Sequence, residues 1–231
     1  MRRMNLDTTD EQDQSDQQGQ SGRSGLFRLR LAMEFAAIFI GGPLAILAIH
    51  RGFILFLVLW LGALIAVAGT RGRAELPKPA LWQEVRGIAV RFSMLTPLIA
   101  LITWLAFPHL FLSLPRQRPL FWAVIMVFYP LLSVWPQEML YRSLLFHRFR
   151  ALFRSDLALI LVSAMSFGFA HIIFLNWIAI AMTAAGGLLF ARDYARHHSL
   201  PLTCLEHSLY GCLIFTVGLG RFFYTGAAWH H

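Results

Sequence analysis

The sequence predicts an all-α fold, a polytopic bundle of about seven transmembrane helices within a range of roughly six to eight. Hydrophobic residues make up 57% of the 231 residues and charged residues only 14%, whereas a soluble domain carries about 25% charged residues. The mean hydropathy is +0.58. Apolar runs close to the roughly 20 residues that one spanning helix needs recur after a polar start. We therefore expect an integral membrane protein.

Residues 1–26 differ from the rest of the chain because they are polar and rich in Gln, Asp and Ser. They offer almost nothing to bury, which predicts a disordered cytoplasmic tail. No apolar stretch follows Arg2 and Arg3 directly, so this segment lacks the order of parts that a signal peptide has. The first apolar run begins near Leu31 and is expected to stay as a membrane anchor.

The expected spans follow the apolar runs in order. They lie at residues 31–49, 53–70, 88–111, 119–148, 157–174, 175–191 and 201–218. Residues 157–191 contain no Asp, Glu, Lys or Arg and would form one helix of about 52 Å, longer than a bilayer core is thick. We therefore expect a break near Leu175, Asn176 and Trp177. Pro130 and Pro136 predict that the 119–148 span is kinked or divided.

The positive charges predict which side of the membrane each end lies on. If the N-terminus is cytoplasmic, thirteen basic residues flank the inner ends of the spans and four flank the outer ends, which is the bias that membrane proteins show. The inner residues are Arg23, Arg28, Arg30, Arg71, Arg73, Lys78, Arg86, Arg91, Arg148, Arg150, Arg154, Arg192 and Arg196, and the outer ones are Arg51, Arg116, Arg118 and Arg221. They are spread over loops without a nucleic-acid-binding motif, so no nucleic acid is expected as a partner.

The two cysteines, Cys204 and Cys212, lie eight residues apart on one predicted helix. That separation prevents a disulfide between them, so we assign them to packing. The chain has no CxxC, no Cys/His zinc spacing, no P-loop and no HExxH. A stretch of small residues at Ala181, Ala184, Ala185, Gly186 and Gly187 predicts close helix packing.

Ionisable residues inside a bilayer are costly and usually mark function. Here they are Glu138, Arg142, His171 and His207. Glu138 and Arg142 are four residues apart and share a helix face, so one interpretation is a neutralised packing pair. A carboxylate and two imidazoles on three helices could instead hydrolyse a bond, with the carboxylate as general base and a histidine as oxyanion donor. The same three groups could also hold a metal ion.

Three stretches of the sequence carry a resemblance to a known family. QEMLYR (137–142), FGFAH (167–171) and EHSLYG (206–211) resemble the motifs of the CPBP (CAAX protease and bacteriocin-processing, or Abi) intramembrane endopeptidases. Those motifs are Glu-Glu-x-x-x-Arg, Phe-x-x-x-His and His-x-x-x-Asn, on separate transmembrane helices. The resemblance divides the chain into N-terminal transmembrane helices at 27–118, a protease-like core at 119–220 and a C-terminal tail at 221–231.

The resemblance implies roles for seven residues. Glu138 and His171 would activate water, and His207 would stabilise the oxyanion. Gln137, Arg142, Phe167 and Gly211 would bind substrate or support the site. We assign no metal ligand, because the glutamate-type mechanism of the family requires no cofactor, although the older metalloprotease view leaves zinc open.

This sequence departs from the motifs at two positions. Gln137 stands where the family has its first glutamate, and a glutamine cannot act as a general base. Gly211 stands where the family has asparagine, which removes a donor that a water, Ser208 or Tyr210 would have to replace. Either Glu138 turns inward and takes over water activation, or hydrolysis is lost.

Three hypotheses for function follow. The first is an intramembrane endopeptidase that cleaves a membrane-associated protein or peptide, such as a prenylated CAAX protein, a bacteriocin leader or a C-terminal sorting tail. The second is a catalytically inactive relative that binds or stabilises a membrane partner. The third is a transporter or channel, which would favour internal repeats that we do not find. The partners expected are membrane lipid and the peptide substrate, and the expected location is a bacterial inner membrane.

Overall fold

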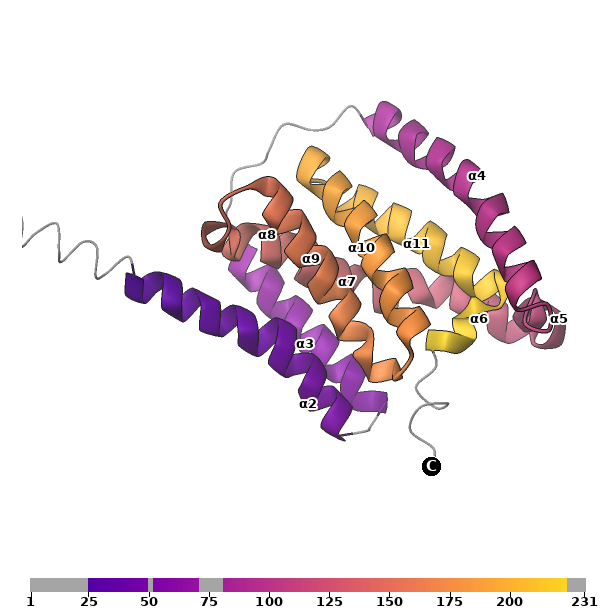
Figure 1. Cartoon of the computed structure of the whole chain (residues 1–231), viewed down its shortest axis with the longest axis horizontal. Helices are drawn as coiled ribbons and strands as arrows, with labels where there is room; N and C mark the ends of the chain where they lie inside the picture. Colours follow the sequence, from indigo (N-terminus) through magenta and orange to yellow (C-terminus); the bar gives the residue numbers. More distant parts are fainter. Residues whose placement is uncertain (1–24, 50–51, 71–80, 224–231) are drawn as a thin grey trace, which may run out of the picture.

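The computed structural model describes residues 25–49, 52–70 and 81–223, and every regular element within these ranges is helical (Figure 1). The all-α prediction is therefore confirmed. The predictions for most of the N-terminal tail and for the end of the C-terminal tail lie outside the described residues. The elements are η1 (Ala37–Gly41), α2 (Gly42–Ile49), α3 (Gly52–Thr70), α4 (Leu81–Ala106), α5 (Ser113–Gln117), α6 (Pro119–Tyr129), η2 (Pro130–Val134), α7 (Trp135–Glu138), η3 (Met139–Leu144), α8 (Leu145–Arg148), η4 (Arg150–Leu152), α9 (Asp156–Ala170), η5 (His171–Phe174), α10 (Trp177–His197), α11 (Leu200–Val217) and η6 (Leu219–Phe223).

Five helical stretches of the described chain are long and apolar enough to cross a membrane. They are Gly25–Ile49, Leu81–Ala106, Pro119–Arg148, Asp156–Phe174 and Leu200–Val217. The other two expected spans are also helical. The apolar part of α3, Ile54–Gly69, is shorter, and the end of α10 carries charged residues.

The third span begins and ends earlier than predicted, at Leu81 and Ala106. Its start tolerates charge because Glu84 forms an ion pair with Arg196 of α10. Its end is set by Phe107 and Pro108, since the residue before a proline is disfavoured in the helical region. In Figure 1, α4 forms one flank of the bundle, beside α11.

The break predicted between α9 and α10 is confirmed. Leu175 has a left-handed backbone with φ 50°. The side chain of Asn176 then accepts a hydrogen bond from the backbone N–H of Ile178 at 2.8 Å, which caps the new helix. The returning helix packs closely on α9: a Cβ added at Gly168 would lie 2.8 Å from the Cβ of Ala184. The small residues of α10 therefore have the packing role expected of them.

The span at 119–148 is interrupted as its prolines predicted. Wider π turns occur at η2 and η3, and only the four residues of α7 separate them. Pro130 begins the first of these turns and cannot donate a backbone hydrogen bond. Turns of this type frequently lie at functional sites, and here they flank Gln137 and Glu138.

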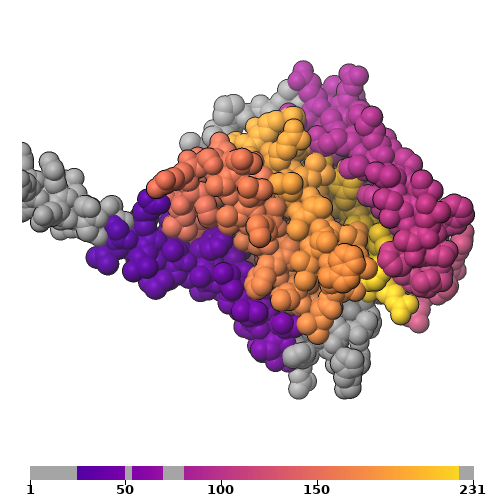
Figure 2. Space-filling view, in the orientation of Figure 1, coloured from indigo at the N-terminus to yellow at the C-terminus, as the bar shows by residue number. Residues whose placement is uncertain are grey.

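The most buried part of the molecule surrounds the second half of this span. Phe39, Tyr141, Leu145 and Phe149 belong to one apolar cluster, and the ring of Phe39 lies 5.3 Å from that of Tyr141. Many large apolar side chains elsewhere are exposed, such as Leu120 and Trp177 at 83% and 76%. Figure 2 shows the packed bundle from one side, with α4 along its edge. Such an apolar exterior suits a lipid surrounding.

Candidate active site

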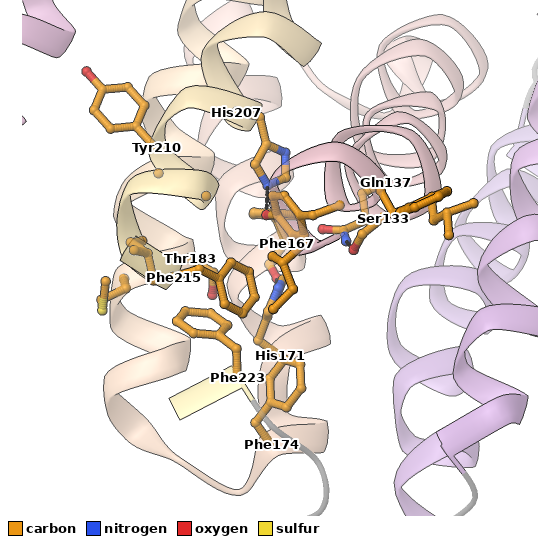
Figure 3. Close-up of a pocket in the computed structure, with 18 of the residues that line it drawn as sticks. Ser133, Gln137, Phe167, His171, Phe174, Thr183, His207, Tyr210, Phe215 and Phe223 are labelled. Atoms are coloured by element: carbon orange, nitrogen blue, oxygen red, sulfur yellow. Dashed lines mark hydrogen bonds between the residues drawn. The ribbon is translucent and has the colours of Figure 1, made fainter. Parts of the chain in front are cut away.

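A cavity of about 510 Å³ lies between α3, the 119–148 span, α9, α10 and α11. Most of its lining is apolar, and the described residues on its wall include no Asp, Glu, Lys or Arg. The polar residues that line it are Tyr129 and, as labelled in Figure 3, Ser133, Gln137, His171, Thr183, His207 and Tyr210. A second cavity of about 380 Å³, between the first span and α3, shares Gln137, His171 and Phe174 with the first. Gln137 and His171 thus lie where the two apolar cavities meet.

His171 stands at the junction of α9 and η5. Its Nδ1 lies 2.7 Å from the backbone carbonyl oxygen of Phe167. A carbonyl only accepts, so Nδ1 carries the proton and Nε2 is left as the acceptor of the neutral ring. The Phe167 ring lies 4.8 Å away and limits where the imidazole can turn. His171 therefore offers a fixed lone pair.

His207 comes from α11 and is held on three sides. Its Nδ1 lies 2.8 Å from Oε1 of Glu138, and its ring stacks on Phe190 with 4.7 Å between centroids. Its Nε2 lies 3.1 Å from the hydroxyl of Tyr129. Because an ionised carboxylate only accepts, Nδ1 donates to Glu138, and Nε2 of the neutral ring accepts from Tyr129.

Glu138 and Arg142 lie behind His207. Both side chains are fully buried, and Nε of Arg142 is 3.2 Å from Oε2 of Glu138. That contact is an ion pair without hydrogen-bond geometry. The guanidinium lies 5.0 Å from the centre of the Phe167 ring and donates to Ser163 at 3.3 Å. The carboxylate is absent from the lining of both cavities, so it does not face water as expected of a direct base.

Gln137 lies on the cavity wall instead. Its side-chain nitrogen donates to the hydroxyl of Ser133 at 2.7 Å. Of the two neighbours 137 and 138, it is therefore the glutamine that meets the space containing both histidines.

The family comparison covers the segment that builds this site. Residues 119–213 match the family model described as type II CAAX prenyl endopeptidase Rce1-like. Over this segment, which is less than half of the chain, the sequence is similar to that family. Neither a curated protein nor a solved structure matches the chain. The match agrees with the resemblance to the CPBP endopeptidases, and it contains all three motifs.

The matched segment brings together the residues that the motifs single out. Gln137, His171 and His207 share one cavity wall, and Phe167 lies between His171 and the Arg142 guanidinium. Glu138 reaches the cavity only through His207. Gly211 also lines the cavity, next to Tyr129.

Sequence reasoning missed Tyr129 and Phe190, which contact His207 directly. Tyr129 lies about two helical turns before Gln137 on the same span, which was the only signal available. Pro130 and the π turn between them conceal whether the two residues share a face. Phe190 has no signal beyond its place on an apolar helix.

A metal site does not fit the donor groups of the described chain. No group of three or more His, Cys, Asp or Glu side chains there could hold a metal ion. Glu138 already contacts Arg142 and His207 with one oxygen each.

Proposed function

We propose that this protein is an intramembrane endopeptidase that hydrolyses a peptide bond of a membrane-associated protein or peptide. The observation that carries the proposal is the Glu138–His207 hydrogen bond at 2.8 Å beside a cavity that also contains His171. A buried carboxylate on Nδ1 fixes the tautomer whose Nε2 takes a proton, and it stabilises the imidazolium that forms. Glu138 thus acts on water through His207.

His207 is the general base in this proposal, rather than the oxyanion donor that the motif resemblance implied. In the first step its Nε2 takes a proton from water, and the water oxygen attacks the scissile carbonyl carbon. The carbonyl oxygen becomes an oxyanion. The imidazolium then gives its proton to the leaving nitrogen, the C–N bond breaks, and a carboxylic acid and an amine are released.

His171 and Gln137 act on the same water and substrate. The Nε2 lone pair of His171 accepts the second hydrogen of the water and orients it. The amide of Gln137 can donate to the substrate backbone, since amides both donate and accept. The two apolar cavities, about 510 and 380 Å³, give an apolar peptide or lipid-modified side chain room on both sides of these polar groups.

Membrane orientation belongs to the same proposal. We place the N-terminus in the cytoplasm of a bacterial cell, with the protein in the inner membrane. Basic residues near the expected inner ends pair across helices: Arg148 contacts Glu34 at 2.7 Å, and Arg196 contacts Glu84. Lipid and a membrane-associated peptide are the partners proposed.

A second candidate function is favoured by Gln137. The cavity wall has an amide where the family motif has an acid, and no carboxylate lines it among the described residues. In that case the protein binds a membrane peptide and releases it uncut. Both candidates use the same cavity and differ only in turnover.

The test uses the purified protein in lipid vesicles. The probe is a farnesylated CAAX peptide with a fluorophore and a quencher flanking the bond to be cut, compared with the same peptide without the farnesyl group. His171→Asn and His207→Asn should each lower kcat by at least about 100-fold. His147→Asn is the matched control, because His147 bonds Ser143 and lines neither cavity.

Two results would count against hydrolysis. Equal turnover in both cavity variants and the control removes the assigned roles. Saturable binding of the probe with no cleaved product at any pH between 5 and 9 would support the second candidate function, which is peptide binding without cleavage. Unfolding temperatures of all three variants should be measured, so that loss of turnover is separated from loss of fold.

A further inference from the structure

Gly211 leaves a space that an aromatic ring from another helix fills. A Cβ added at Gly211 would lie 2.3 Å from Cε1 of Tyr129 and 2.5 Å from its hydroxyl oxygen. Real Cβ atoms do not approach other atoms so closely, so any side chain at 211 would displace the ring. Tyr129 can occupy this place only because residue 211 is glycine.

The Tyr129 hydroxyl is held at the reacting end of His207. It lies 3.1 Å from Nε2, and its ring packs edge-on against Phe215 with 5.2 Å between centroids. The residue lines the cavity. The other candidate, Tyr210, is directed away from His207 in Figure 3, and its ring lies 5.4 Å from Phe92 of α4. Ser208, the other residue that the sequence suggested, lines neither cavity.

We propose that Tyr129 is the oxyanion donor of this site and takes the place of the missing side chain at position 211. The inference rests on the proposed hydrolysis. In the resting site the hydroxyl donates to Nε2 of His207. When the water hydrogen-bonds to Nε2 it displaces the hydroxyl, whose proton turns to the substrate carbonyl oxygen; Nε2 then takes the water proton as that oxygen becomes the oxyanion. No proton leaves Tyr129, so the step balances with the water proton on His207.

The direct test removes the hydroxyl and keeps the ring. Tyr129→Phe should lower kcat for the farnesylated probe by about 100-fold, as loss of one oxyanion donor does, with KM changed by less than about threefold. Tyr194→Phe is the control, because Tyr194 is a buried tyrosine that lines neither cavity. It should stay within about twofold of the unmodified protein.

A positional exchange separates the donor role from simple packing. Gly211→Asn alone should lower both the unfolding temperature and kcat, because its Cβ overlaps the Tyr129 ring. Tyr129→Ala alone should lose the donor. The double variant Tyr129→Ala with Gly211→Asn restores a donor in the vacated space. Its unfolding temperature should therefore be higher than that of Gly211→Asn, and its kcat should be at least about tenfold higher than that of Tyr129→Ala.

The outcomes distinguish this inference from the function on which it rests. If the unmodified protein cleaves the probe and Tyr129→Phe is as fast, the donor role is wrong while hydrolysis stands. If the unmodified protein never cleaves, hydrolysis fails and the donor role fails with it. If the change in unfolding temperature of the double variant equals the sum of the changes in the two single variants, Tyr129 and residue 211 do not compete for one space. That result would also overturn the inference.

Discussion

At the scale of single residues, the Glu138 carboxylate lies between two cationic or proton-bearing groups and has no exposed surface. Arg142 approaches one oxygen at 3.2 Å, and His207 approaches the other at 2.8 Å. A buried charge is tolerated only when it is paired, so Arg142 lets an ionised carboxylate persist behind His207. The same pair would be necessary for either candidate function, because both need the cavity to keep its shape.

Removal of one member of this pair should cost more than removal of both charges. Arg142→Met leaves the Glu138 charge buried alone and should lower the free energy of unfolding by about 3–5 kcal/mol. The double variant Glu138→Gln with Arg142→Met carries no buried charge and should recover part of that loss. Equilibrium unfolding in detergent micelles measures both. A double variant less stable than Arg142→Met would contradict the pairing argument.

Gln137 decides how much catalysis the cavity supports. Gln137→Glu puts a carboxylate on the wall that His171 and His207 share, where it can take a proton from water directly. We expect kcat for the farnesylated probe to rise by at least about tenfold. Gln137→Leu is the control for loss of the Ser133 contact and should bring no gain. Equal turnover in the two variants would show that an acid at 137 is not what the site lacks. Cleavage that appears only in Gln137→Glu would identify the natural chain as the inactive form.

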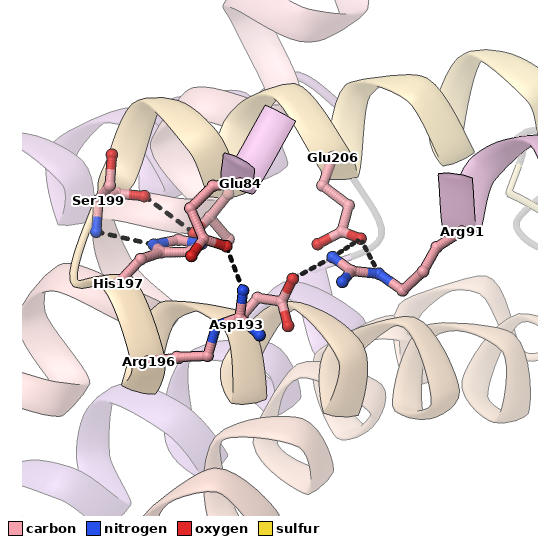
Figure 4. Close-up of polar contacts among 8 residues, drawn as sticks. Glu84, Arg91, Asp193, Arg196, His197, Ser199 and Glu206 are labelled. Atoms are coloured by element: carbon pink, nitrogen blue, oxygen red, sulfur yellow. Dashed lines mark hydrogen bonds and ion pairs between the residues drawn. The ribbon is translucent and has the colours of Figure 1, made fainter. Parts of the chain in front are cut away.

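At the scale of elements, α4 contributes to the bundle an arginine that faces two acids. Arg91 contacts Oε1 of Glu206 on α11 at 2.8 Å and also the carboxylate of Asp193 on α10 (Figure 4). The two carboxylates are buried, at 0% and 2% exposure, whereas Arg91 keeps 26%. Asp193 and Glu206 thus depend on a residue from a helix that otherwise lies at the edge.

Arg91→Ala should therefore destabilise the protein far more than an ordinary surface change. It leaves two neighbouring buried carboxylates without their counter-charge, and we expect a loss of about 3–5 kcal/mol in the free energy of unfolding. Arg86→Ala, on the exposed side of the same helix, is the matched control and should change it by less than about 0.5 kcal/mol. Equal losses in the two variants would mean that the two carboxylates do not depend on Arg91.

Composition was enough to predict the helices. The site could be predicted only where the spacing of the motifs indicates which residues lie together. The apolar runs and the Asn176 break follow from hydropathy and capping, and the motifs correctly place polar groups on three packed helices. The choice between Gln137 and Glu138 could not be made, because neighbouring helical residues point about 100° apart and a π turn precedes them. Tyr129 could not be found either, since its role depends on the absence of a side chain on α11.

At the scale of the whole molecule, the charge bias predicts that the two ends of the 119–148 span lie on opposite sides of the membrane. Arg118 precedes this span and Arg154 follows it. In a chain with Cys204 and Cys212 replaced by alanine, Arg118→Cys should react with an impermeant maleimide in right-side-out vesicles, and Arg154→Cys should react only after the vesicles are opened. The reverse pattern would place the N-terminus outside.

The π turns determine how the central span responds to the loss of a residue, which its composition does not reveal. Each such turn holds one residue more than the α-helical turn in its place. Deletion of a single residue from η3 would therefore convert it into an α-helical turn and leave Leu145 and Phe149 in the apolar cluster they occupy. The same deletion in α9, which is α-helical throughout, would rotate the rest of that helix by about 100°. A loss of one residue should thus be tolerated better within 139–144 than in α9.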